Sequence, residues 1–189
     1  MHFVDMVTKK ESLLLIQLDL VALEYSPCDN FVVCCEKWNM QSPAENLFII
    51  CTKTGAIKAK FEWKKSPKDS IKSIRFSSDE SYCLRLIPNL SSKDVNSIEI
   101  YKNGDFTKPF CVIPAKFATK ALQNAKKGIP PVFVDGRFDG LDLCPLNPSL
   151  EPEKSPFYLF AWQNAQTMTT EEDCGTVYVY DLHGQTLNK

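Results

Sequence analysis

One order of apolar and polar positions occurs twice along the chain. In the first occurrence an apolar run closes on Tyr25, a polar turn led by Ser26 follows, and Phe31 opens a second apolar run. Residues 76–82 repeat this order fifty-one positions later. Two apolar runs joined by a short polar turn are typical of a β-hairpin. The sequence therefore predicts the same hairpin twice.

Three further runs alternate roughly between apolar and polar positions and end in a turn with glycine, at residues 47–55, 97–104 and 176–184. Such a run indicates an outer strand that enters a tight turn. The pattern predicts three units of four strands. The expected strands are 20–26, 31–38, 47–52 and 56–63, then 71–77, 82–87, 97–102 and 109–113, then 140–144, 157–162, 176–182 and a fragment after Gly184.

A period near fifty residues with four short antiparallel strands per period indicates β-propeller blades. A β-sandwich also has short strands and turns, but it does not repeat this order. We therefore expect an all-β fold of about three WD-like blades, an arc of a larger propeller. The expected parts are strands of a preceding blade at 1–18, blades at 19–66 and 67–113, an insertion at 114–137 and a degenerate blade at 138–189.

Two segments interrupt the repeat. Residues 114–131 are rich in alanine and lysine and end at a glycine and two prolines, which favours a short helix between blades. Residues 164–174 are polar and acidic, which indicates a loop between strands.

Composition excludes several classes of protein. The net charge is −1, and no apolar run is long enough to cross a membrane, so a wholly basic surface and membrane insertion are not expected. The first residues lack an export pattern, which predicts a cytoplasmic protein with reduced cysteines. We expect the cysteines within apolar runs to be small buried hydrophobes: Cys34, Cys35, Cys51, Cys83 and Cys111.

Catalytic and metal-binding patterns are not found in the sequence. It has no Cys-x-x-Cys pair, only two histidines, no phosphate-binding glycine loop and no Gly-x-Ser-x-Gly turn. The adjacent Cys34 and Cys35 should face opposite sides of a strand, without a histidine placed to activate either one. We therefore expect no enzyme, no metal, no cofactor and no small-molecule substrate.

Several motifs resemble a known family. The segments "EYSPCDNFVV", "NLFIICTKTGAIKAKFEWKK", "IRFSSDESYCLRL" and "IEIYKNGDF" are similar to early blades of the eukaryotic translation initiation factor 2A family, a WD-type propeller family. The propeller of the b subunit of the third initiation factor is a second, less similar choice. The resemblance implies a role in translation initiation, with the small ribosomal subunit, initiator tRNA or mRNA, and other initiation factors as partners.

One basic stretch is the candidate for contact with RNA or the ribosome. Between residues 58 and 75, seven basic residues stand against two acidic ones, a local charge of +5. Such clusters meet phosphate backbones, and Trp63 could add base stacking. The alternative is a solvent-exposed face of a strand followed by a solvated loop, with residues 57, 59, 61 and 63 on the other face. The candidate residues are Lys58, Lys60, Lys64, Lys65, Lys68, Lys72 and Arg75.

Two alternatives stay open at this point. A WD-like platform that binds only proteins would use the same fold without an RNA role. Tryptophans near strand ends, such as Trp38, Trp63 and Trp162, usually pack between neighbouring blades, although an exposed one can anchor a peptide.

Overall fold

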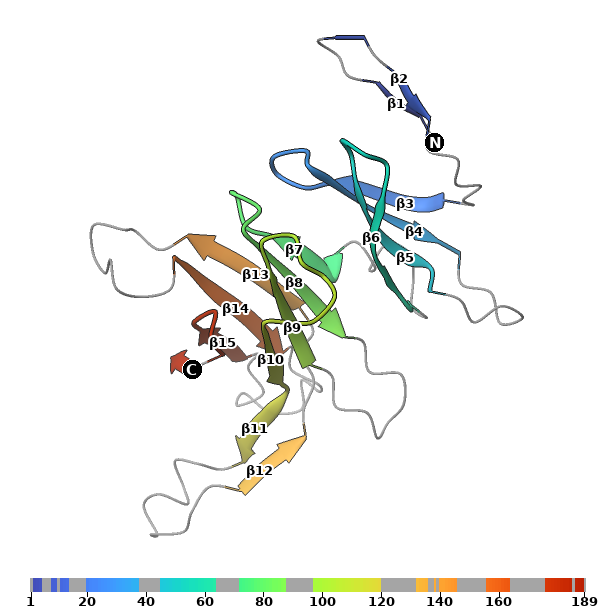
Figure 1. Cartoon of the computed structure of the whole chain (residues 1–189). Coiled ribbons are helices and arrows are strands. Elements are labelled where there is room, and N and C mark those ends of the chain that lie inside the picture. Colours follow the sequence, from blue (N-terminus) through green and yellow to red (C-terminus); the bar gives the residue numbers. More distant parts are fainter. Residues whose placement is uncertain are drawn as a thin grey trace. The chain divides into compact units, whose positions relative to one another are not determined.

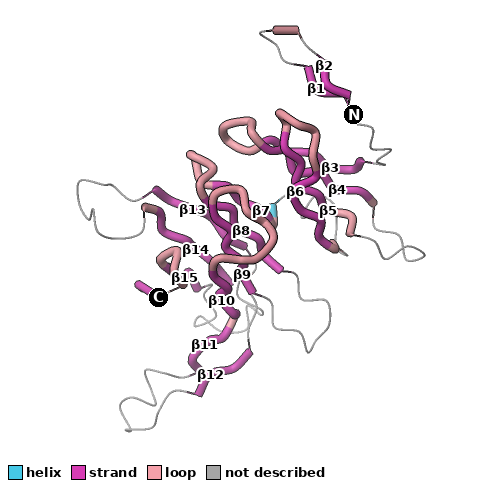
Figure 2. Tube along the Cα trace, in the orientation of Figure 1, coloured by secondary structure: helices cyan, strands magenta, loops and turns pink. Residues whose placement is uncertain are grey.

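In the described part of the computed structural model, the secondary structure consists almost wholly of short antiparallel strands (Figures 1 and 2). The chain forms two compact units, residues 1–84 with 101–109 and residues 85–100 with 110–189, and each is treated by itself. The structure describes residues 2–4, 8–9, 11–13, 20–37, 45–63, 72–87, 97–119, 132–135, 138, 140–145, 156–163, 176–184 and 186–188.

The first sheet contains β3 (Leu20–Tyr25), β4 (Phe31–Glu36), β5 (Leu47–Cys51) and β6 (Ile57–Phe61), in that order across the sheet. All neighbours are antiparallel. The two central strands are buried on both faces, which explains their nearly continuous apolar sequence. The sequence predicted each of these strands to within about two residues of its observed ends.

The second sheet has the order β10-β9-β8-β7. Its strands are β7 (Ile74–Phe76), β8 (Tyr82–Ile87), β9 (Ser97–Lys102) and β10 (Cys111–Pro114). The third sheet contains β13 (Gly140–Pro145), β14 (Phe157–Gln163), β15 (Thr176–Tyr180) and β16 (Thr186–Asn188), again in sequence order. Three antiparallel four-stranded sheets confirm the predicted class, an all-β fold built of propeller blades.

Two smaller hairpins accompany the blades. Strands β1 (His2–Val4) and β2 (Glu11–Leu13) form the first, within the segment expected to hold strands. Strands β11 (Lys116–Thr119) and β12 (Val132–Asp135) form the second. The predicted helix over 114–131 is wrong at its start. The segment Phe117-Ala118-Thr119 pairs with a run of β-branched and aromatic residues at 132–134, and this pairing outweighs the helix propensity of alanine and lysine.

The repeated hairpin turn keeps its hydrogen bonds from one blade to the next. In the first turn, the Phe31 amide donates to the Ser26 hydroxyl at 2.9 Å. In the second turn, the Tyr82 amide donates to the Ser77 hydroxyl at 3.0 Å. The residue three positions after each serine has positive φ, 58° at both Asp29 and Glu80. The backbone conformation of this turn therefore repeats with the same fifty-one-residue period as the sequence.

The first unit has its main core on one face of the first sheet. There Val33, Cys35, Leu47 and Ile49 share a cluster with Ile74, Cys83, Tyr101 and Phe106 from the second repeat. The Phe31 ring stacks on the Phe76 ring, with centroids 5.6 Å apart, and meets Phe106 edge to face at 5.7 Å. This is how one blade packs on the next within this unit.

The other face of the first sheet has a smaller cluster. Val32, Cys34 and Ile50 are fully buried there, with Phe48 beside them. The adjacent Cys34 and Cys35 therefore face opposite sides, as predicted, and both are buried because both faces are covered. Among the other three cysteines, Cys83 is buried, and Cys51 and Cys111 are half-buried.

Strand β6 departs from the expected alternation. Ile49 pairs with Ala59, but the next residue of β5, Ile50, pairs with Ile57, so Lys58 is the extra residue of a β-bulge. The prediction that Ile57 shares a face with Ala59 is therefore wrong. Ile57 packs beside the Val32 and Cys34 cluster, and Ala59 lies on the opposite face.

Candidate binding surface

The first part of the candidate surface is the outer edge of the first sheet, strand β6. The Lys58 and Lys60 side chains are exposed, and Ala59 between them is buried. The β5–β6 turn adds the exposed Lys53. Three ammonium groups thus belong to one edge strand and its turn. Lysines on an edge strand also prevent pairing with another chain, so this arrangement has a structural use besides any binding role.

A thiol at the start of this turn reports the local field. Burial by itself raises the pKa of Cys51, but hydrogen bonds from Thr54 and Lys53 and the positive charge of Lys58 lower it below its ordinary value. The local hydrogen bonds and the charge of Lys58 therefore favour the thiolate form of Cys51.

The other basic residues of the predicted stretch, from Lys64 to Arg75, are only partly within the described residues. Lys64, Lys65 and Lys68 lie outside the described residues. Lys72 is exposed. Arg75 is half-buried on β7, and its guanidinium donates to the Ile74 carbonyl at 3.1 Å.

Strand order separates Arg75 from the lysines of β6. Arg75 lines a pocket together with residues of β3, and β4 and β5 lie between β3 and β6 in the first sheet. The candidate residues therefore lie at two places. Lys58 and Lys60 are on β6, the outer edge of the first sheet, and Arg75 is on β7 of the second sheet, beside β3, the inner edge of the first sheet. Their joint action as one contact surface stays a prediction.

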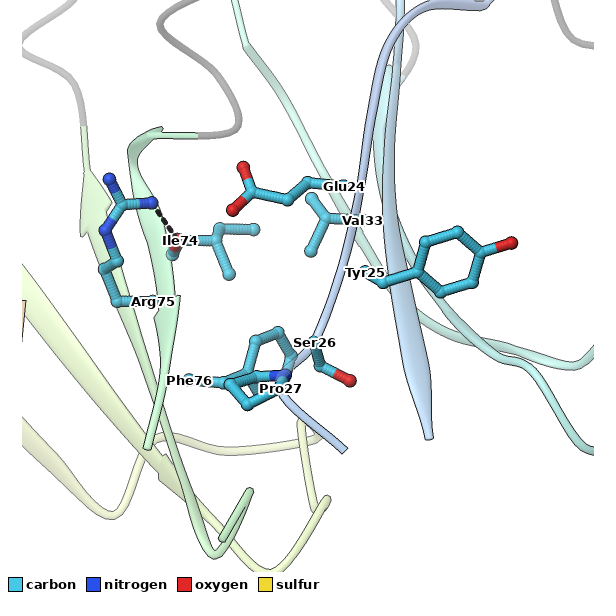
Figure 3. Close-up of a pocket in the computed structure, with 8 residues that line it drawn as sticks. All are labelled: Glu24, Tyr25, Ser26, Pro27, Val33, Ile74, Arg75 and Phe76. Carbon is cyan, nitrogen blue, oxygen red and sulfur yellow. Dashed lines mark hydrogen bonds between the residues drawn. The ribbon is translucent and has the colours of Figure 1, made fainter. Parts of the chain in front are cut away.

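The pocket at the inner edge has a volume of about 140 Å³ (Figure 3). Apolar side chains, among them Val33 and Ile74, form its wall. Glu24 reaches toward Ile74, and the Arg75 side chain runs along β7 with its guanidinium at the Ile74 carbonyl. The ring of Tyr25 points away from it. One carboxylate and one guanidinium beside an apolar wall can hold a short polar group of a partner, such as a peptide side chain.

The two equivalent turns are held together by one buried carboxylate. Glu80, 7% exposed, accepts hydrogen bonds from the Cys28 amide at 2.6 Å and from the Asn30 side chain at 2.7 Å. Burial raises the pKa of Glu80, but the hydrogen bonds from Ser26, Asn30 and Cys28 outweigh burial and lower it. We call this set the Glu80 clasp. It fixes the first turn on the second, directly beside the pocket.

Sequence reasoning missed Glu24 and Glu80. Glu24 lies on β3, and the order of apolar and polar residues along this strand does not reveal which strand of the next repeat lies beside it. For Glu80 a signal existed, because Asp29 and Glu80 stand at the same position of two equivalent turns, three residues after a serine.

The suggested base-stacking role of Trp63 is wrong. Its side chain is 3% exposed and belongs to the core between the two repeats. Its amide donates to the Asn46 side chain at 2.7 Å, and its carbonyl accepts from the same side chain at 3.0 Å. Trp63 therefore packs between blades, as strand-end tryptophans usually do.

Within the described residues, no group of three or more histidine, cysteine, aspartate or glutamate side chains could hold a metal ion. No helix in this part of the chain is long and apolar enough to cross a membrane.

The fold and the repeated turn define the class: this is a chain of antiparallel four-stranded sheets of the β-propeller blade type. A solved structure named "Crystal structure of the eukaryotic initiation factor" is similar over 99% of this chain, with a TM-score of 0.61 and 15% identity. This chain spans 38% of the length of that one. The likeness supports an initiation-factor-like propeller fold. No protein-family model and no curated protein matches the sequence.

Proposed function

We propose that this chain is a propeller segment of a translation initiation factor of the 2A type, acting in the cytoplasm without catalysis. Its blade edges would bind the small ribosomal subunit, initiator tRNA or mRNA, or other initiation factors. The observation that carries the proposal is the similarity, over 99% of the chain, to a structure named as an initiation factor. The sequence motifs of the first two repeats support the particular family.

The exposed lysines of β6 are the described residues best suited to meet RNA. Lys58 and Lys60 are exposed on an edge strand, and Lys53 lies on the adjoining turn. A flexible ammonium on an exposed edge can reach phosphates without sequence selectivity. The proposal therefore assigns positioning on RNA or ribosome to this edge.

A salt titration tests this assignment. Binding of the purified chain to small ribosomal subunits and to initiator tRNA is measured over a range of salt concentrations, for the wild type and for a Lys58→Ala, Lys60→Ala double variant. If both lysines contact phosphates, the slope of log affinity against log salt should fall by about 1 per lysine. A Lys37→Ala, Lys108→Ala variant removes the same charge from exposed positions elsewhere and should keep the wild-type slope.

Equal slopes in the two double variants would reject the role of β6.

The second candidate function is a protein-binding platform without an RNA role, which the pocket between Glu24 and Arg75 favours. In that case tRNA binding should be absent in the wild type. Binding to RNA-free initiation factors should then depend on Glu24 and Arg75 rather than on the lysines.

A further inference from the structure

Strand β3, the inner edge of the first sheet, directs main-chain groups to its free side. The Ser26 amide donates to the Phe31 carbonyl at 3.0 Å, so these two residues form a hydrogen-bonded pair. In an antiparallel ladder such pairs alternate with pairs whose amides and carbonyls point away from the partner strand. Along the register from Ser26, Leu23 and Tyr25 are of the second kind. Their main-chain groups therefore point to the free edge, where no further strand of the described residues pairs.

The side chains of β3 leave this edge open to another strand. Leu23 and Tyr25 are 43% and 49% exposed, and the one charged residue in the sequence of the strand is the exposed Glu24. The other edge of the sheet, β6, carries the exposed Lys58 and Lys60, and lysines on an edge disfavour pairing with another chain. An extended segment can therefore add to the sheet at β3 through main-chain hydrogen bonds.

The alternation of side chains along β3 determines what such a segment would meet. Glu24 lies between the two outward-pointing residues and lines the pocket together with Val33 and Ile74, whereas the ring of Tyr25 points away from it (Figure 3). Residues directly opposite each other on paired strands have their side chains on the same face of the sheet. The residue opposite Glu24 would thus face the pocket, and its two neighbours would lie beside Leu23 and Tyr25.

Charge decides which segment fits. If β3 paired with β3 of a second copy through both outward-pointing residues, Glu24 would stand directly opposite Glu24, and like charges at such positions are destabilising. A basic side chain opposite Glu24 forms a cross-strand ion pair instead, and its aliphatic stem can lie on the apolar wall of the pocket. The Arg75 guanidinium is bonded to the Ile74 carbonyl of β7, so Glu24 is the charge directly opposite the added residue.

We propose that β3 binds an extended segment of a partner protein as an additional antiparallel strand, with a basic residue opposite Glu24 between two apolar residues. The antiparallel direction continues the pattern of the sheet, in which all neighbours are antiparallel. The proposal rests on the protein-binding function and specifies its partner. It is independent of the RNA role of β6.

The proposal is tested with the peptide Thr-Val-Lys-Val-Thr, blocked at both ends and added to the whole chain labelled with ¹⁵N. The amides of Leu23 and Tyr25 should gain protection against exchange with solvent, whereas those of Ala22 and Glu24 already point to β4. Replacing the peptide lysine by glutamate should raise the dissociation constant by about threefold to tenfold, because an attractive cross-strand pair becomes a repulsive one.

Protein variants test the assignment to Glu24. Glu24→Lys should reverse the preference, so that the peptide with glutamate binds more tightly than the peptide with lysine. Glu45→Lys is the matched control, because it makes the same charge change at an exposed residue outside β3 and should keep the wild-type preference. A wild type that prefers the glutamate peptide would overturn the proposal, since Arg75 would then select the partner.

Methylation of peptide nitrogens tests the register without any change in the protein. A methyl group on the nitrogen of either valine removes a donor to β3 and should abolish binding, whereas one on the lysine nitrogen, which points away from β3, should be tolerated. The opposite result, or no peptide binding, would overturn the proposal. If initiation factors still bind through Glu24 and Arg75 in that case, the protein-binding function stands and only the added strand is rejected. The salt titration of β6 is a separate readout, because the Lys58→Ala, Lys60→Ala variant should bind the peptide as the wild type does.

Discussion

The Glu80 clasp offers the sharpest test of how one blade is fixed on the next. Glu80→Gly removes the carboxylate that receives the Cys28 amide and the Asn30 side chain at 2.6 and 2.7 Å. It also places glycine at a backbone position with φ of 58°. Asp29→Gly makes the same backbone change at the equivalent turn position, where φ is also 58° and the side chain is exposed. The pair of variants therefore separates the carboxylate from the backbone.

The magnitude can be built from these contacts. A hydrogen bond to a charged group contributes about 1.5–3 kcal/mol, so the two together contribute about 3 kcal/mol or more. Glycine relieves about 1–2 kcal/mol of left-handed strain and costs about 0.5–1 kcal/mol of chain entropy. Asp29→Gly should change the free energy of unfolding by about 1 kcal/mol or less. Glu80→Gly should lower it by about 2–3 kcal/mol relative to the wild type.

The assay is urea unfolding followed by tryptophan fluorescence, to which Trp63 contributes from its buried position in the unit that holds the clasp. The folded-state pKa of Glu80 is lowered from 4.5, so its contribution is complete above that pH and is lost as the pH falls through the lowered value. The difference in the free energy of unfolding between the wild type and Glu80→Gly should therefore become smaller in acid. Equal stabilities of Glu80→Gly and Asp29→Gly at neutral pH would refute the reasoning.

Two further predictions concern buried groups of the first sheet. Asn46→Ala should lower the free energy of unfolding by about 2–4 kcal/mol, because the buried amide and carbonyl of Trp63 lose their partner. Glu45→Ala, at the exposed neighbouring residue, is the control and should have little effect in the same urea assay. In the folded chain a maleimide should label the exposed Cys28 but not Cys34, whose pKa is raised to about 12, chiefly by burial. Peptide mass mapping reads this out, and labelling of Cys34 before unfolding would contradict the assignment.

The strands were predictable because the apolar runs and turns that define each blade depend on residues close together in the sequence. A serine-led turn between two aromatic residues needs only neighbours in the sequence, and the hydrogen bonds of Ser26 and Ser77 stay within their own turns. The hairpin of β11 and β12 was not predictable in this way. Its first strand is rich in helix formers, and its identity comes from a partner strand more than ten residues away in the sequence.

The bulge in β6 shows a second limit. A strict period of two places Ile57 with Ala59, but one extra residue at Lys58 moves Ile57 to the opposite face. Nothing in the local sequence marks this step, because lysine is accepted at an exposed bulge as readily as in a regular edge strand. The error concerns the very stretch from which the candidate binding residues were taken.

The candidate surface was harder to predict than the fold, since it depends on which strands share an edge. Residues 58–75 form one basic run in the sequence, but the chain passes from the outer strand of one blade to the inner strand of the next within that run. This step is inherent in a propeller, so charges on the two sides of a blade boundary belong to different edges. Lys58 and Lys60 can then meet a ligand without Arg75, and Arg75 can act with Glu24 at the inner edge without the lysines. A basic run that crosses a blade boundary should therefore be tested as two surfaces, each with its own variants.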